Sequence, residues 1–160
     1  MKVNVGCGND IRKGWVNLDF RDEDGVDVVA DITEGMPFKD GECDELLCQD
    51  VLEHFPLAMT DKILSEWARV LRKGGYITIE VPNMELNFKH WILGETKCLP
   101  GQNMTERFSE IVFGKQDYVG NFHYQLFDRS RFDEILPRNG FEVIEYYERG
   151  RALGVKARKV

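Results

Sequence analysis

Two glycines, one residue apart, end a short apolar run at the start of the chain. The segment Lys2 to Val5 predicts a buried strand, and the turn Gly6-Cys7-Gly8 follows it directly. Because glycine has no side chain, such a turn leaves backbone N–H groups bare for a ligand. Asp19 ends a second expected strand, 15–20, and would bring a carboxylate to the same sheet edge. The pattern predicts a nucleoside pocket at the carboxyl ends of parallel strands.

Alternating strand and helix signals run through the rest of the chain and predict a mainly parallel α/β sheet. The apolar positions from Ile63 to Leu71 form one helical face, with Thr60 as its expected N-cap and Gly74-Gly75 as its stop. A later helix is expected to begin at the Ser130-x-x-Asp133 capping box and to end early at Pro137. The further expected strands are 26–30, 45–48, 76–81, 141–147 and 153–157, the last being antiparallel.

Two connections depart from a regular strand–helix alternation. Only Asn9 to Gly14 join the first two strands, so the first helix is either reduced to a single turn or replaced by an extended loop. Residues 83–125 mix aromatic and charged residues without a clean period, and we expect helical turns near 85–93 and 104–112. An insertion of this length is typical of a lid or substrate-binding segment.

Composition limits the classes of protein to which the chain can belong. With 160 residues and 42% apolar content we expect one domain, 1–160. The net charge of −7 argues against a nucleic-acid binder, which needs a basic surface. No stretch has the length of a membrane span and no signal peptide is visible, so we expect a cytoplasmic protein. The four cysteines form no C-x-x-C pair, so we expect reduced thiols and no metal site.

Five motifs in register resemble those of class I S-adenosylmethionine-dependent methyltransferases. They are Val3-Asn-Val-Gly-Cys-Gly8, Leu18-Asp19, Ala30-Asp31, Gln49-Asp-Val-Leu-Glu-His54 and Val70-Leu-Arg-Lys-Gly-Gly-Tyr76. The chain is most similar to small predicted methyltransferases whose second strand begins Gly-Trp-x-Asn-Leu-Asp, here 14–19. The resemblance covers nearly the whole chain. It implies a Rossmann-like methyltransferase fold, with a seven-stranded, mainly parallel sheet, an antiparallel last strand and a reduced first helix.

The resemblance also implies a set of residues that bind S-adenosyl-L-methionine. Asp19 would take the ribose hydroxyls, with Phe20 stacking beside the adenine. Asp31 and the backbone of Ile32 would contact the adenine amino edge, and Gln49 would face the centre of the cofactor. The full expected set is Gly6, Cys7, Gly8, Asp19, Phe20, Asp31, Ile32 and Gln49.

Methyl transfer from a sulfonium mainly requires that the acceptor atom be held in line with the methyl group. A general base is needed only when the acceptor starts protonated, and histidine suits that role. His54 and His123 are the two candidate catalytic residues. A structural hydrogen bond to a backbone carbonyl is the other interpretation of His54, and we expect His90 to be a packing residue.

Two hypotheses on function follow. In the first, the chain is a methyltransferase that acts on a small-molecule or sugar-like acceptor. In the second, it is a non-catalytic cofactor-binding subunit or an inactive relative that supports a partner. The short connection between the first two strands favours this second hypothesis. A nicotinamide-dependent oxidoreductase is excluded by spacing, because Ile11 stands where a third glycine belongs. We expect the pocket to be closed by residues 83–125 or by a second subunit, as in a homodimer.

Overall fold

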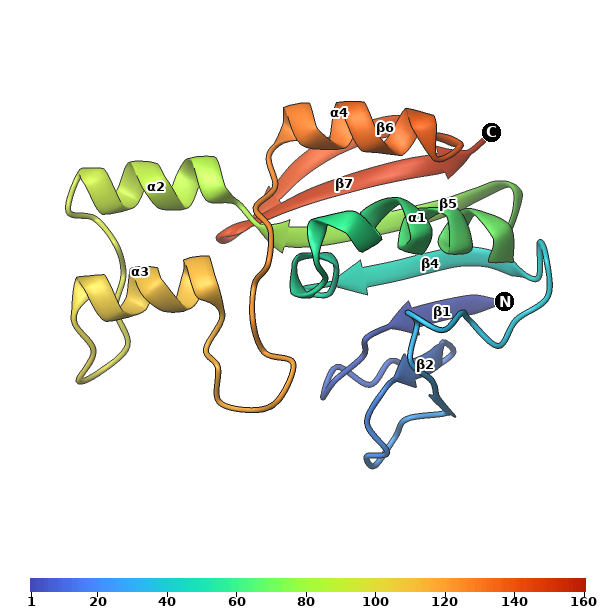
Figure 1. Ribbon diagram of the computed structural model, residues 1–160, viewed down its shortest axis with the longest axis horizontal. Helices are drawn as coiled ribbons and strands as arrows, with labels where there is room; N and C mark the ends of the chain where they lie inside the picture. Colours follow the sequence, from blue (N-terminus) through green and yellow to red (C-terminus); the bar gives the residue numbers. More distant parts are fainter.

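Seven strands form one sheet in the order β3-β2-β1-β4-β5-β7-β6 in the computed structural model, which describes residues 1–160 (Figure 1). The strands β1 to β5 run parallel to one another, whereas β7 is antiparallel to both β5 and β6. This confirms the predicted mainly parallel sheet with an antiparallel last strand. The strands are β1 (Lys2–Val5), β2 (Val16–Asp19), β3 (Val28–Val29), β4 (Cys43–Gln49), β5 (Leu71–Pro82), β6 (Phe141–Arg149) and β7 (Ala152–Lys159).

The helices are distributed unevenly along the chain. None lies before residue 52, and α1 and α4 lie along the sheet while α2 and α3 stand beyond its end (Figure 1). The α-helices are α1 (Thr60–Val70), α2 (Met84–Ile92), α3 (Met104–Phe113) and α4 (Arg129–Arg138), and two 3₁₀ turns are η1 (Leu52–His54) and η2 (Leu57–Met59). No helix is both long and apolar enough to cross a membrane.

One hydrophobic core joins α1 and α4 to one face of the sheet. Trp67 from α1 and Phe132 from α4 are both fully buried in a cluster with Val5 and Ile79 from the strands. Strand residues that alternate with these core positions are largely polar, as shown by Lys2 of β1, which pairs with Glu45 of β4 at 2.7 Å. Because alternate residues point to opposite faces, this sheet needs only one layer of helices.

The connection between β1 and β2 contains no helix, so the expected reduced first helix is absent and the extended-loop alternative is correct. Asparagine side chains on the strands hold this loop in place. Asn4 Nδ2 donates to the Asp10 carbonyl at 2.7 Å, and Asn17 Oδ1 accepts from the Arg12 N–H at 2.9 Å. These hydrogen bonds satisfy loop backbone groups that a helix would otherwise have paired internally.

Several predicted element boundaries differ from the structure. Helix α1 ends at Val70 and β5 begins at Leu71, so the expected helix stop at Gly74-Gly75 is wrong and lies inside a strand. Helix α1 begins at Thr60 itself and its N-cap is Met59, because η2 leads directly into it. Helix α4 is capped by Asp128, whose Oδ1 accepts from the Arg131 N–H at 2.8 Å, so the expected cap at Ser130 is wrong. Pro137 lies inside that helix rather than ending it. Proline cannot donate the i→i−4 hydrogen bond at this position, and the helix ends one residue later, at Arg138.

Residues 83–125 contain the two expected helices, followed by a return segment. Helices α2 and α3 pack together through Trp91 and Phe108, whose rings stack with centroids 4.9 Å apart. The chain then runs back past η1, where the Tyr124 N–H donates to the Glu53 carbonyl at 2.8 Å. We call residues 114–126 the return segment.

Candidate functional site

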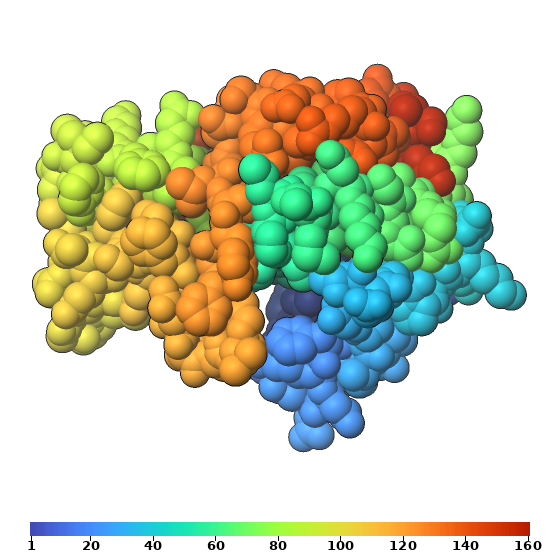
Figure 2. Space-filling view, viewed as in Figure 1, coloured from blue at the N-terminus to red at the C-terminus, as the bar shows by residue number.

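A pocket of about 660 Å³ opens at the carboxyl ends of the first strands. Figure 2 shows the surface hollowed between the blue N-terminal residues and the orange residues of the return segment. All eight residues of the expected cofactor set line this pocket, and His54 lines it as well, whereas His123 does not. The predicted strand ends therefore meet in one cavity. The role of each residue there stays a prediction.

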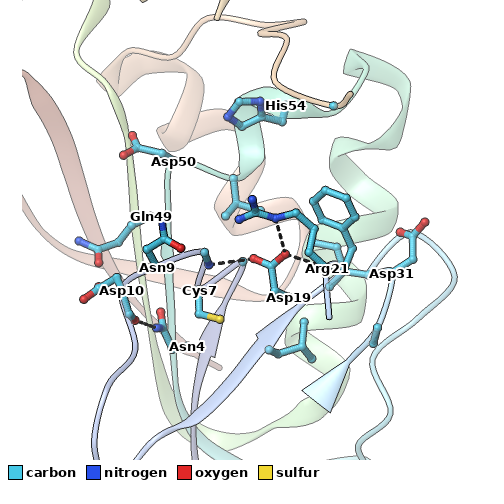
Figure 3. Close-up of a pocket in the computed structure, with 18 of the residues that line it drawn as sticks. Asn4, Cys7, Asn9, Asp10, Asp19, Arg21, Asp31, Gln49, Asp50 and His54 are labelled. Carbon is cyan, nitrogen blue, oxygen red and sulfur yellow. Dashed lines mark hydrogen bonds and ion pairs between the residues drawn. The ribbon is translucent and has the colours of Figure 1, made fainter. Parts of the chain in front are cut away.

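Asp19 is anchored at the centre of the pocket (Figure 3). Its side chain is almost fully buried, and its Oδ2 accepts from the Gly8 N–H at 2.8 Å. Its Oδ1 accepts from the Arg21 N–H at 3.0 Å and, more weakly, from Arg21 Nε at 3.3 Å. Three donors hold the carboxylate in one orientation, with one acceptor position left on Oδ2.

The glycine turn is sterically required. Gly6 has φ +64°, and a Cβ built on it would lie only 2.3 Å from Cγ2 of Val51. Gly8 has φ +49° with its N–H directed to Asp19. Left-handed backbone conformations and close contacts of this kind both favour glycine. The turn after β1 therefore packs directly against the turn after β4.

Phe20, Asp31 and Ile32 line the pocket, and Figure 3 shows Asp31 on the side of Asp19 away from Gln49. Phe20 is 56% exposed, so part of its side chain is accessible for stacking. The guanidinium of Arg21 lies 5.8 Å from this ring and 5.2 Å from the ring of Tyr118 in the return segment. The return segment thus reaches the edge of the pocket.

The opposite end contains a charged network that the sequence analysis missed. Gln49 Oε1 accepts from Arg12 Nη2 at 2.8 Å, and Gln49 Nε2 donates to Glu80 Oε2 at 2.6 Å. Arg149 donates to both oxygens of Glu80, and Tyr147 donates to Oε1 at 2.7 Å. One signal was available in the sequence, because Glu80 is a charged residue within the mostly apolar second half of β5, 76–81.

Glu80 is ionised in spite of its position. Its side chain is 5% exposed, and burial alone would raise the pKa of its carboxyl group. The hydrogen bonds from Arg149, Tyr147 and Gln49 outweigh that effect and lower the pKa below its ordinary value. The carboxylate therefore fixes the orientation of the Gln49 side chain at the pocket wall.

Asp50 and His54 face the same end of the pocket. Asp50 has φ +51°, a strained conformation for a residue with a Cβ, and its carboxylate makes no hydrogen bond within the protein. Partial desolvation, together with the nearby Glu80, raises the pKa of Asp50. His54 Nδ1 donates to the Phe122 carbonyl at 3.0 Å, as the structural interpretation of this residue expected.

His123 lies next to His54, outside the pocket lining. The two rings meet edge to face with centroids 4.8 Å apart, and His123 Nδ1 donates to the Ile111 carbonyl at 3.0 Å. Partial burial lowers the pKa of both imidazoles, so both are neutral at pH 7. Of the two histidines, only His54 can touch a molecule in the pocket directly.

Cys7 is a packing residue between the two glycines. It is buried, and burial together with the charge of Asp19 raises the pKa of its thiol to about 11. At neutral pH it is therefore a thiol and not a nucleophilic thiolate. The other cysteines, Cys43, Cys48 and Cys98, are also free, as predicted.

Comparison with protein families gives one match, over residues 3–79, to the family described as Methyltransferase domain. That range contains the glycine turn, Asp19, Asp31, Gln49 and His54. A search of curated protein sequences gives no match.

Solved structures resemble the fold over 99% of this chain. One is the Burkholderia thailandensis 1,6-didemethyltoxoflavin-N1-methyltransferase with bound 1,6-didemethyltoxoflavin and S-adenosylhomocysteine, at 16% identity, TM-score 0.67 and 70% of that chain. A second is a SAM-dependent methyltransferase from Thermotoga maritima, at 18% identity, TM-score 0.68 and 82% of that chain. A third is a SAM-dependent methyltransferase from Archaeoglobus fulgidus, at 14% identity, TM-score 0.66 and 85% of that chain.

Proposed function

We propose that the chain, whose residues 3–79 match the family described as Methyltransferase domain, transfers a methyl group from S-adenosylmethionine to a small-molecule or sugar-like acceptor. The single observation that carries this proposal is the convergence of the glycine turn, Asp19 and Asp31 on one pocket. Its volume of about 660 Å³ lies within the usual range for cofactor and substrate sites, ~300–1,000 Å³.

The residues present fit the cofactor. The free acceptor position on Asp19 Oδ2 can take one ribose hydroxyl, and the long 3.3 Å contact from Arg21 Nε is the one that a second hydroxyl would displace. The exposed ring of Phe20 offers a stacking face for the adenine. Asp31, whose Oδ1 accepts only the Thr33 N–H, keeps acceptor capacity for the adenine amino group.

When bound, the cofactor supplies a methyl group on a sulfonium, which a nucleophile can take directly. The chain must then place the acceptor and, for a hydroxyl or a protonated amine, remove a proton. Asp50 and His54 both line the pocket, and each carries a group that can accept a proton. We place the acceptor there, with Asp50 and His54 as the candidate bases and His123 as a residue that positions His54.

The charges of the pocket support a small polar acceptor. Asp10 pairs with Arg12 at 2.7 Å, and Asp19 pairs with Arg21, so these carboxylates are neutralised within the protein. Asp50 makes no ion pair, so its carboxyl group is available to a polar group of the acceptor. A carboxylate in this position favours a hydroxyl or amine group and repels the phosphates of a nucleic acid.

Isothermal titration with S-adenosylmethionine and S-adenosylhomocysteine tests the cofactor part of this proposal. We expect saturable binding to the wild type and binding about 10- to 100-fold weaker to Asp19→Asn, because charge-assisted hydrogen bonds to the ribose are lost. Asp27→Asn is the matched control, since Asp27 also accepts a backbone N–H, from Asn17 at 2.8 Å, but lies outside the pocket.

Two outcomes would contradict the proposal. Absence of binding at millimolar cofactor would exclude the enzyme, and equal losses in Asp19→Asn and Asp27→Asn would exclude the assigned pocket. Binding without transfer to any of a panel of hydroxyl and amine acceptors would favour the non-catalytic subunit. The helix-free connection between β1 and β2 is the structural feature that supports this second candidate.

A further inference from the structure

Three potential metal ligands meet beside the pocket. Glu53 and His54 come from η1, and His123 comes from the return segment. One ligand atom from each of the three lies within 4.8 Å of the others. No other group of three or more His, Cys, Asp or Glu residues in the chain is arranged in this way.

The carboxylate of Glu53 lacks a partner. The residue is 1% exposed, and neither Oε1 nor Oε2 makes a hydrogen bond within the protein. A buried carboxylate is costly unless a cation or a proton compensates it, so a cation bound here would stabilise the site.

The two imidazoles are oriented to supply one lone pair each. His54 Nδ1 donates to the Phe122 carbonyl and His123 Nδ1 donates to the Ile111 carbonyl, both at 3.0 Å. The neutral tautomer that makes these bonds leaves Nε2 of each ring as a free acceptor. Histidines that bind metals are typically held in this way, with the other ring nitrogen donating to a carbonyl or carboxylate.

We propose that Glu53, His54 and His123 bind a divalent transition-metal cation, with Zn²⁺ as the best match, and that water fills the fourth position. Two histidines and a glutamate are a donor set that suits zinc. Ligand atoms about 2.0–2.1 Å from a tetrahedral zinc are roughly 3.3 Å apart. The three ligand atoms, now within 4.8 Å of one another, therefore approach each other by about 1.5 Å at most when the metal binds.

The cation would join the return segment to η1. These two parts are already linked by the Tyr124 N–H to the Glu53 carbonyl and by Gln125 Nε2, which donates to the Leu52 carbonyl at 3.1 Å. Tyr118 in the same segment lines the pocket. Metal binding thus holds the return segment against the pocket. It also makes His54 a ligand, which leaves Asp50 as the base at the acceptor end.

Direct titration with the metal tests the site without requiring any methyl transfer. The parent protein is the full chain with Cys98→Ser, which removes the exposed thiol. A chelator first removes any bound metal. The protein is then titrated with Zn²⁺, followed by calorimetry, and with Co²⁺, followed by visible absorption. We expect one ion per chain with a tetrahedral Co²⁺ spectrum. Binding should be at least about 100-fold weaker in Glu53→Gln and in His123→Gln, because each loses a ligand. His90→Gln, which changes the histidine outside the cluster, should bind like the parent.

Thermal unfolding separates loss of the site from loss of the fold. Glu53→Gln removes a buried charge that has no partner, so without metal it should melt at or above the temperature of the parent. Zinc should raise the melting temperature of the parent and leave that of Glu53→Gln unchanged, because only a ligand that binds the folded state stabilises it. Absence of stoichiometric zinc binding by the parent, or equal binding by parent and both cluster variants, would overturn the proposal.

Discussion

The contact between Gly6 and Val51 predicts that Gly6→Ala destabilises the protein in two ways. The new residue must adopt φ +64°, and its Cβ would lie 2.3 Å from Cγ2 of Val51. The left-handed conformation costs about 1–2 kcal/mol, and overpacking adds about 1–3 kcal/mol. A loss of about 3 kcal/mol corresponds to a fall of roughly 6–12 °C in melting temperature for a chain of this size.

Gly94→Ala is the matched control. Gly94 has a similar φ of +71°, but a Cβ built there has no neighbour within 4 Å. This variant should lose only the conformational part, about 1 kcal/mol, or roughly 2–4 °C. The difference between the two alanine variants measures the contact between the turns after β1 and β4.

A double-mutant cycle with Val51→Ala identifies the contact. Val51→Ala removes both Cγ atoms, so Gly6→Ala should cost about 1–3 kcal/mol less in that background. The assay is urea unfolding followed by far-UV circular dichroism, with the free energy extrapolated to water. The reasoning is refuted if Gly6→Ala is no more destabilising than Gly94→Ala, or if the two changes at Gly6 and Val51 are additive.

Two further predictions concern the charge network and a helix cap. The folded-state pKa of Glu80 lies below its ordinary value of about 4.3, so its contribution to stability is present above that pH and is lost as pH falls through the folded-state pKa. The wild type should therefore be more stable than Glu80→Gln at pH 7, with a gap that narrows below about pH 4 in urea unfolding; a constant gap from pH 3 to 7 would contradict this assignment. Asp128→Ala should lose about 1 kcal/mol in the same assay and Ser130→Ala only a few tenths, because Asp128 is the cap of α4. Equal losses in these two variants would show that the cap is assigned wrongly.

Local patterns in the sequence were sufficient to predict the sheet and the main pocket residues. The first strand was predicted with its observed bounds, because it is a short apolar run closed by glycines. The pocket follows from topology, since the carboxyl ends of parallel strands meet at one edge. Gly6, Asp19 and Asp31, which lie at or just after three successive strands, therefore line one pocket as expected.

Tertiary contacts decided the features that the sequence patterns missed. The cap of α4 is Asp128 and not the predicted Ser130, because the cap is the residue whose side chain reaches the Arg131 N–H. The absence of the first helix depends on Asn4 and Asn17, which bind loop backbone groups from neighbouring strands. Neither interaction leaves a period or a motif in the sequence.

The two ends of the candidate site differ in the same way. The end around Asp19 is encoded locally, because a strand, a turn and a carboxylate follow one another within 17 residues, 3–19. The other end joins Glu80 to Arg149, and Glu53 to His123, across about 70 residues in each pair. The burial of Glu80 and Glu53 exists only after the chain has packed. Sequence alone thus determined where a cofactor could lie, whereas the fold decided which charges are paired and which remain without a partner, because pairing and desolvation depend on distances in space.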